Sequence, residues 1–354
     1  MLVNCSNCHT ALQLPPAAAS IRCAVCGALT KIAGQRAPPL PSSSFSGGYQ
    51  NHYPTPSAPP PPAHGRKRAV IVGITYRYSR HQLKGCINDA RCMKYLLVNR
   101  FKFPESSILM LTEDETDPYR IPTKHNIRMA MYWLVQGAQP GDSLLFHYSG
   151  HGSQQRNYTG DEIDGFDETL LPLDFQTQGM IVDDEINATM VRPIPRGAKL
   201  HAIIDACHSG TILDLSYLCR MDSRSGSYAW EDQRPRSGIW KGTSGGEAIC
   251  FSGCDDDQVS ADTAALSKVT TTGAMTFAFI QAVERGQATT YGNMLNAMRS
   301  IIRTSQDDFL SGGGVATTLI SMLLTGGSFG FGLTQEPQLS SNEPFHVYSK
   351  PFSL

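Results

Sequence analysis

Residues 199–210, with the sequence KLHAIIDACHSG, decide how this chain folds. The apolar run predicts a buried strand, and the Ser-Gly pair after it predicts a tight turn that exposes Cys207. In open α/β sheets, ligands bind beyond the carboxyl ends of the strands. A thiol at that edge is a candidate nucleophile, provided that a base lies within reach.

A second apolar strand supplies the base. Residues 142–152, DSLLFHYSGHG, carry His151 at the carboxyl end. Two strands that end in His and Cys can place an imidazole beside a thiol, which activates the thiol for attack. The histidine precedes the cysteine by roughly 50 residues, which is the order and spacing of caspases. The backbone N–H groups of Gly152 and Cys207 are candidates to hold the developing oxyanion. A structural cysteine beside an unrelated histidine is the alternative, and the paired glycine turns disfavour it.

Strands and helices alternate around these two segments. The other predicted strands are residues 68–74, 108–111 and 248–252. The predicted helices are residues 86–98, a helix capped by Thr123, about 273–285 and about 290–303. This alternation predicts an α/β fold, with a mainly parallel sheet sandwiched by helices.

Composition narrows the functional classes. The 354 residues carry a net charge of −1, so we expect no nucleic-acid partner. No apolar run of about 20 residues predicts a membrane span, and no signal-peptide pattern opens the chain. We therefore expect a reducing, cytoplasmic location in which the ten cysteines are thiols or metal ligands. Arg66-Lys67-Arg68 is a weak nuclear signal or, alternatively, a solvated strand entrance or a protease-sensitive site.

The first 66 residues contain a small metal site and a linker. Two Cys-x-x-Cys pairs fall within residues 1–33, and four thiolates at this spacing suit tetrahedral zinc: Cys5, Cys8, Cys23 and Cys26. So small a ribbon gains its folding energy largely from the metal. Residues 34–66 are rich in Pro, Ser and Gly and predict a disordered linker.

Two carboxylates indicate the substrate. Asp205 lies two residues before Cys207 and therefore faces the same side of its strand. Asp89 opens the first predicted helix, near the same sheet edge. Two carboxylates in one pocket favour a substrate with a cationic Arg or Lys side chain through charge-assisted hydrogen bonds. In the alternative reading, Asp89 caps its helix and Asp205 is a structural hydrogen-bond partner.

Three acidic segments indicate a cation. The loop 160–168 does not fit the EF-hand spacing, but residues 183–185 are a second cluster and Asp214 follows the Cys207 strand. Carboxylates from three segments suit an oxygen cage for Ca²⁺. The alternative is that these acidic loops are simply solvated.

The motifs Tyr-Ser-Gly-His-Gly at His151 and Asp-Ala-Cys-His-Ser-Gly at Cys207 resemble the catalytic dyad of the metacaspases, which are caspase-fold cysteine proteases. The zinc ribbon, the Pro-rich linker and the short insert between halves resemble the plant type I metacaspases over essentially the whole chain. The resemblance implies a large catalytic half at 67–220, a basic cleavable linker at 221–246 and a small half at 247–354.

The resemblance also implies site residues. The S1 pocket would contain Cys86, Asp89, Ser149 and Asp205, and activating calcium would bind Asp167, Asp183, Asp184 and Asp214. Because a protease that prefers Arg or Lys carries basic residues in its own insert, we expect self-cleavage of a zymogen there; the candidates are Arg220, Arg224, Arg234, Arg236 and Lys241. An ordinary solvated loop is the alternative.

The implied role is in programmed cell death and the hypersensitive defence response, with the ribbon binding regulators that carry similar zinc fingers. Cys254 falls where the small half should meet the pocket, in a substrate-contact or a structural role. A different class of function is a zinc-ribbon adaptor in which proteolysis is secondary; the intact Cys207, His151 and pocket carboxylates argue against a dead enzyme.

Overall fold

The computed structural model describes four short strands near the amino terminus and then residues 66–160, 162, 165–221, 227–235, 237–255, 273–311 and 335–354. The chain forms two compact units, Met1–Thr55 and Pro56–Leu354. In the first unit, β1 (Leu2–Asn4) pairs with β2 (Ala11–Gln13), and β3 (Ser20–Arg22) pairs with β4 (Leu29–Lys31). The four cysteines predicted to bind zinc lie outside the described residues.

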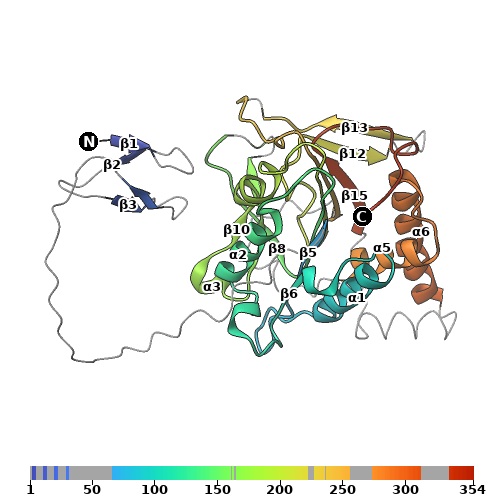
Figure 1. Ribbon diagram of the computed structural model, residues 1–354. Coiled ribbons are helices and arrows are strands. Elements are labelled where there is room, and N and C mark those ends of the chain that lie inside the picture. Colours follow the sequence, from blue (N-terminus) through green and yellow to red (C-terminus); the bar gives the residue numbers. More distant parts are fainter. Residues whose placement is uncertain are drawn as a thin grey trace, which may run out of the picture. The chain divides into compact units, whose positions relative to one another are not determined.

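An eight-stranded sheet forms the centre of the second unit (Figure 1). Its order is β13-β12-β15-β14-β11-β7-β5-β6. The parallel strands are β5 (Lys67–Gly73), β6 (Ile108–Thr112), β7 (Ser143–Ser149), β11 (Lys199–Asp205) and β14 (Glu247–Asp255). The antiparallel strands are β15 (Gln335–Ser341), β12 (Tyr217–Met221) and β13 (Tyr228–Asp232). The prediction of a caspase-like, mainly parallel sheet is confirmed.

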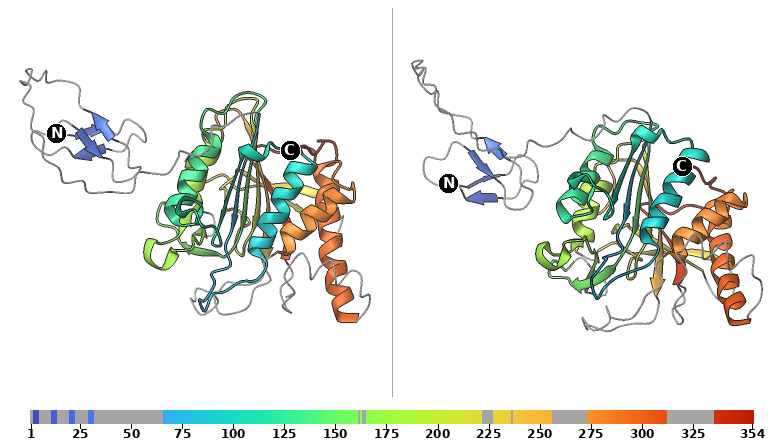
Figure 2. Two further views of the ribbon diagram at one scale, coloured as in Figure 1. Left: turned by 60° about the horizontal axis from the view of Figure 1, so that its bottom comes forward. Right: turned by 90° about the horizontal axis from the view of Figure 1, so that it is seen from below.

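Helices cover both faces of this sheet (Figure 2). On one face lies α2 (Lys124–Val135), and on the other lie α1 (Cys86–Asn99), α5 (Ala274–Glu284) and α6 (Tyr291–Ser311). Successive residues of a strand point to opposite faces. Accordingly, Val70 and Val72 pack in the α2 core, whereas Ala69 and Ile71 pack in the other.

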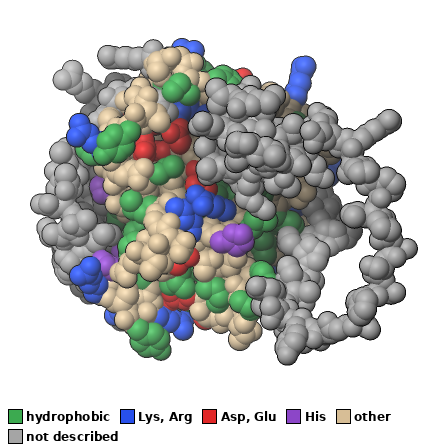
Figure 3. All heavy atoms as spheres, turned by 90° about the vertical axis from the view of Figure 1, so that its left-hand side faces the viewer, with side chains coloured by type: hydrophobic (Ala, Val, Ile, Leu, Met, Phe, Trp, Pro, Cys, Tyr) green, Lys and Arg blue, Asp and Glu red, His purple; other side chains and the backbone are tan. Residues whose placement is uncertain are grey.

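After β7 the chain forms a small antiparallel sheet. It contains β8 (Gly152–Arg156), β9 (Phe166–Leu170) and β10 (Ile181–Val182). The short helices are η1 (Glu105–Ser107), η2 (Pro118–Arg120), α3 (Phe175–Gln178), α4 (Asp183–Ile186) and the π-helical η3 (Asn187–Val191). This sheet and α4 carry the acidic segments. Figure 3 shows the face that includes α2 and α3, where acidic and basic side chains are interspersed.

The insert at 221–246, expected as a basic linker, contains a strand. Residues 228–232 form β13, which pairs with β12 along five residues. The Nε1 of Trp230 donates a hydrogen bond of 2.7 Å to the carbonyl oxygen of Phe345, and the two rings lie 5.0 Å apart. Aromatic packing against the carboxyl-terminal segment therefore orders this part of the insert. Among the described residues, none of the helices is long and apolar enough to span a membrane.

Gly73 fixes the distance between β5 and α1. A Cβ atom at this position would lie 2.6 Å from the carbonyl oxygen of Cys86 and 2.9 Å from the Cβ of Ala90. The first turn of α1 therefore rests directly on the end of β5, and this contact sets the position of Asp89.

We expect Gly73→Ala to destabilise the protein by about 1–3 kcal/mol, because the added methyl overpacks a backbone contact that cannot yield cheaply. Urea unfolding followed by circular dichroism measures this loss. An unchanged midpoint would show that α1 can move away from β5 at no cost.

Candidate active site

The carboxyl ends of β7 and β11 meet at one edge of the sheet. The two strands pair in parallel with Ser149 opposite Asp205, and the Gly150 amide donates to the Asp205 carbonyl oxygen over 3.2 Å. A Cβ atom at Gly152 would overlap the carbonyl oxygen of Cys207. His151 and Cys207 are thus carried on backbones in direct contact, as the two sequence motifs predicted.

A backbone carbonyl orients the imidazole of His151. The ring Nε2 lies 2.7 Å from the carbonyl oxygen of His81, which can only accept, so Nε2 carries the proton. In the neutral ring, Nδ1 then carries the lone pair. The Tyr76 ring packs 4.7 Å from the imidazole centroid, and the Tyr76 hydroxyl accepts a bond from the His151 amide. Burial lowers the pKa of His151, partly opposed by the bond to His81. The ring is therefore neutral near pH 7 and suited to act as a base.

A tight turn presents Cys207. This cysteine is half-buried and forms no disulfide. His208 follows it with φ of 48°, a left-handed conformation that turns the chain sharply. The hydroxyl oxygen of Ser209 lies 2.8 Å from the carbonyl oxygens of both Ala206 and Gly253. The nucleophile turn is therefore fastened to β14, which belongs to the other half of the sheet.

Three of the four residues predicted for the S1 pocket lie together beside this turn. Ser149 Oγ donates to Asp89 Oδ2 over 2.9 Å, and the carboxylate of Asp205 lies close enough to influence Asp89. Burial raises the pKa of both carboxyls, and for Asp89 the neighbouring Asp205 adds to this effect. The fourth residue, Cys86, is buried at the first position of α1.

The amino terminus of α5 completes this carboxylate pair. The Thr276 amide donates to Asp205 Oδ2 over 2.7 Å, and a Cβ at Gly273 would lie 3.3 Å from Asp89 Oδ2. Helix amino termini favour negative charge. Burial raises the pKa of Asp205, and hydrogen bonds from Thr276, Gly273 and Met275 at the start of α5 oppose this effect. The other oxygen, Asp205 Oδ1, is buried and makes no well-aligned hydrogen bond with the described residues.

A second acidic cluster lies in the small sheet and α4. Ligand oxygens of Glu162, Asp167 and Asp183 lie within 4.8 Å of one another. Burial raises the pKa of Asp183 to about 9, and the carboxylates of Asp214, Glu168 and Glu162 add to the effect. Oxygen donors from several segments that repel one another fit a calcium ion.

The remaining two predicted calcium ligands, Asp184 and Asp214, are bridged by the ammonium of Lys241. The Lys241 Nζ lies 2.5 Å from Asp184 Oδ1 and also bonds to Asp214, and its side chain is 1% exposed. Lys241 was expected to be a self-cleavage candidate, with a solvated loop as the alternative. In this structure its side chain is buried and ion-paired, so it is inaccessible to a P1 pocket while the ammonium stays in place.

The other candidate cleavage residues differ in their surroundings. Arg220 is exposed in β12 and pairs with Glu231 of β13, and Arg234 is exposed and pairs with Asp232. Arg224 and Arg236 lie outside the described residues, as does the side chain of Cys254.

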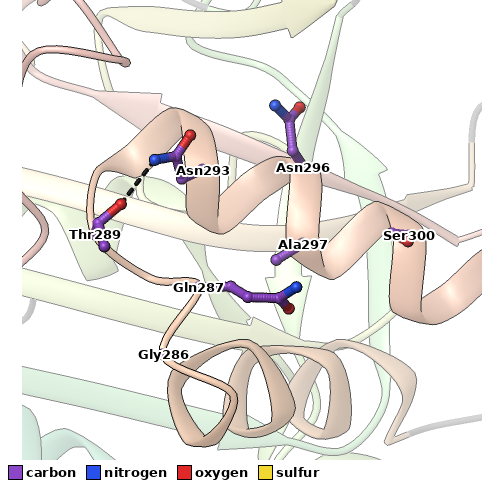
Figure 4. A pocket seen from close by; sticks show the side chains of 7 residues that line it. All are labelled: Gly286, Gln287, Thr289, Asn293, Asn296, Ala297 and Ser300. Carbon is purple, nitrogen blue, oxygen red and sulfur yellow. Dashed lines mark hydrogen bonds between the residues drawn. The ribbon is translucent and has the colours of Figure 1, made fainter.

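Several site contributors carried little sequence signal. Glu162 was part of the acidic loop but was not expected to be a ligand. The His81 carbonyl and the Thr276 amide are backbone groups, which any residue type supplies. A hollow of about 410 Å³ between the end of α5 and α6 is lined by other residues than the two acidic clusters and the dyad (Figure 4).

Comparison with known proteins agrees with this geometry. Residues 67–216 match the metacaspase, peptidase C14 domain, and residues 5–28 match the LSD1 zinc finger. The chain is 69% identical to Metacaspase-1 of Arabidopsis thaliana over 357 residues, which cover 100% of this chain and 96% of that protein. The chain belongs to the metacaspase family. Its zinc-finger match and C14 domain confirm the predicted type I architecture.

Other metacaspases are similar over different spans. Metacaspase-2 of Arabidopsis thaliana is 53% identical over 417 residues, with both chains fully covered. Metacaspase-1 of Cryptococcus neoformans is 41% identical over 280 residues, covering 69% of this chain and 61% of the fungal protein. This metacaspase is therefore a member of a cysteine protease family.

We expect Gly152→Ala to reduce the protease activity of this metacaspase by about 100-fold or more, because a displacement near 1 Å at reacting groups has that effect. The added Cβ has to push the Cys207 carbonyl away from the His151 strand. Casein hydrolysis compared with Cys207→Ala measures the loss, with circular dichroism as the control for folding. Full activity in a folded variant would contradict this account of the dyad.

Proposed function

We propose that this metacaspase is a calcium-dependent endopeptidase that cleaves after Arg or Lys. The buried carboxyl pair of Asp205 and Asp89, two residues of chain away from Cys207 and with one Asp205 oxygen lacking a well-aligned hydrogen bond, is the observation that carries the proposal. A guanidinium or ammonium group at P1 supplies both the missing donor and the positive charge for two crowded carboxyls. An Asp at P1, as in caspase substrates, would add a third negative charge.

The proposed reaction uses the orientation of His151. Its Nδ1 accepts the proton of the Cys207 thiol, and the thiolate attacks the carbonyl carbon of the P1 residue. Amides at Gly152 and Cys207 are the candidates to hold the oxyanion. The imidazolium then gives its proton to the leaving amine, which leaves an acyl-enzyme. Water, activated by the same imidazole, attacks the thioester, and the acid product and the thiol are released.

Calcium would bind at the acidic cluster of the small sheet. Glu162, Asp167 and Asp183 support this, with Asp184 and Asp214 beside them. When bound, the ion supplies positive charge that orders these acidic segments. Asp214 follows the Cys207 turn by seven residues, so the cluster and the nucleophile share one short stretch of chain.

The remaining proposals rest on the resemblance to type I metacaspases. We infer self-processing within the insert 221–246, a zinc ion held by Cys5, Cys8, Cys23 and Cys26, and regulators that carry similar zinc fingers. We also infer a cytoplasmic protein, with a nuclear fraction, that regulates programmed cell death and the hypersensitive response. The zinc-finger match favours an adaptor function as the second candidate.

The decisive test is hydrolysis of fluorogenic peptides with Arg, Lys or Asp at P1, in calcium and in chelator. We expect calcium-dependent cleavage after Arg and Lys, none after Asp, and none by Cys207→Ala. Cleavage after Asp would refute the pocket assignment, and equal rates in chelator would refute the role of calcium. Inactivity toward all three peptides, also after removal of residues 1–33, would favour the adaptor.

A second test concerns the carboxylate pair. Asp89→Asn is expected to lower kcat/KM for an arginyl peptide by about 10–100-fold, through loss of a charged hydrogen-bond partner. In the wild type, the raised pKa values mean that kcat/KM for this peptide falls as pH decreases. Without the charge of Asp89, Asp205 ionises more easily, so this fall moves to lower pH. Glu105→Gln, at an exposed ion pair with Lys94, is the control. An unshifted pH profile would argue against the pair.

A further inference from the structure

Lys241 reaches from the insert into the acidic cluster. Its side chain is almost fully buried, and its ammonium contacts Asp184 Oδ1 at 2.5 Å and also bonds to Asp214. An ammonium so enclosed has exchanged its hydration for these carboxylates. It is therefore unlike the exposed pair of Lys94 and Glu105 on the same unit.

The main chain around Lys241 holds the ammonium in this place. The side-chain Nδ2 of the buried Asn187 donates to the carbonyl oxygens of Lys241 at 3.0 Å and Asp214 at 3.1 Å. One side chain thus joins the insert to the segment that follows Cys207. Just before Lys241, Trp240 and Ile239 remain exposed, at 57% and 39%. The anchored ammonium is the buried end of a segment that is otherwise at the surface.

Lys241 and a calcium ion would compete for the same oxygens. The resemblance assigns Asp184 and Asp214 to calcium, yet here they bind a side-chain cation. A divalent ion on these carboxylates would repel an ammonium within a few ångströms, and the two charges cannot share one small oxygen cage. Calcium that used Asp184 and Asp214 as ligands would therefore require the ammonium to leave.

We propose that Lys241 is a built-in competitor of calcium, and that calcium displaces its ammonium and thereby releases residues 237–245 from the large half. This inference rests on the proposed calcium site and names its regulation. This competition weakens the apparent affinity of the protein for calcium, because only molecules with Lys241 displaced can bind the ion. Binding of one calcium ion to the acidic cluster would then also release the insert.

Calorimetric titration of CaCl₂ into the full chain tests the inference. All proteins carry Cys207→Ala, so that self-cleavage does not interfere. We expect Lys241→Ala to bind calcium at least about 10-fold more tightly, since close charge pairs of this kind couple by 1.4 kcal/mol or more. Lys241→Arg keeps the charge and is expected to stay near the wild type. Lys94→Ala removes a surface lysine and is expected to change nothing.

The outcomes separate the two proposals. Equal affinity of the wild type and Lys241→Ala, or weaker binding by the variant, would overturn the competition while leaving the calcium site in place. Heat release from neither protein would overturn the calcium site and the competition with it. Binding by Lys241→Ala alone would support the competition strongly.

Two further measurements guard against a variant that merely folds poorly. In chelator, Lys241→Ala should melt below the wild type, because its carboxylates are no longer neutralised. In saturating calcium, the two melting temperatures should converge; a deficit that persists with calcium would mean that Lys241 is structural. Chymotryptic cleavage after Trp240 should accelerate with calcium in the wild type and be fast without calcium in the variant. A rate that calcium does not change in the wild type would refute release of the segment.

Discussion

The parallel pairing of β7 with β11 is the constraint on which the site depends. With Ser149 opposite Asp205, both strands end at the same level, and the catalytic candidates come from the residues just beyond. The contact between Gly152 and the Cys207 carbonyl leaves room for no side chain. A slip of this register would change which residues lie at the edge and which face they present. Hydrophobic burial of the two strands therefore also fixes the position of His151 relative to Cys207.

The same edge contains several ionisable groups removed from water. Burying carboxyls is costly unless donors or cations compensate them. One oxygen of Asp205 accepts a hydrogen bond from the amino terminus of α5. The ammonium of Lys241 forms ion pairs with Asp184 and Asp214. Around Asp183, two backbone amides donate to the carboxylate, but no cation neutralises it among the described residues, and burial with neighbouring carboxylates raises its pKa to about 9. These buried carboxyls are the observations on which the proposals for P1 and calcium rest.

Much of this arrangement was readable from the sequence because local patterns determine it. The apolar runs ahead of His151 and Cys207 specify parallel strands, and the helix cap at Thr123 bonds to the Asn126 amide as its position indicates. The proximity of Asp89 followed from its place at the start of α1. Lys241 could not be read in this way, because its burial depends on segments about 30 to 60 residues distant, and by itself it is one basic residue among several. The sequence did not predict β13. Tyr228 and Trp230 are two residues apart, as on one face of a strand, but the residues around them are mostly polar, which is typical of a loop.

The strand order gives the sheet an interleaved construction. β15, from the end of the chain, lies between β12 of the large half and β14 of the small half, while β14 also pairs with β11 of the large half. A single break in the chain between β12 and β13 would sever one covalent connection and none of these ladders. The two resulting polypeptides would already be paired strand to strand, with no new interface left to form. Such a break would change how the new chain ends can move, within a body that stays whole.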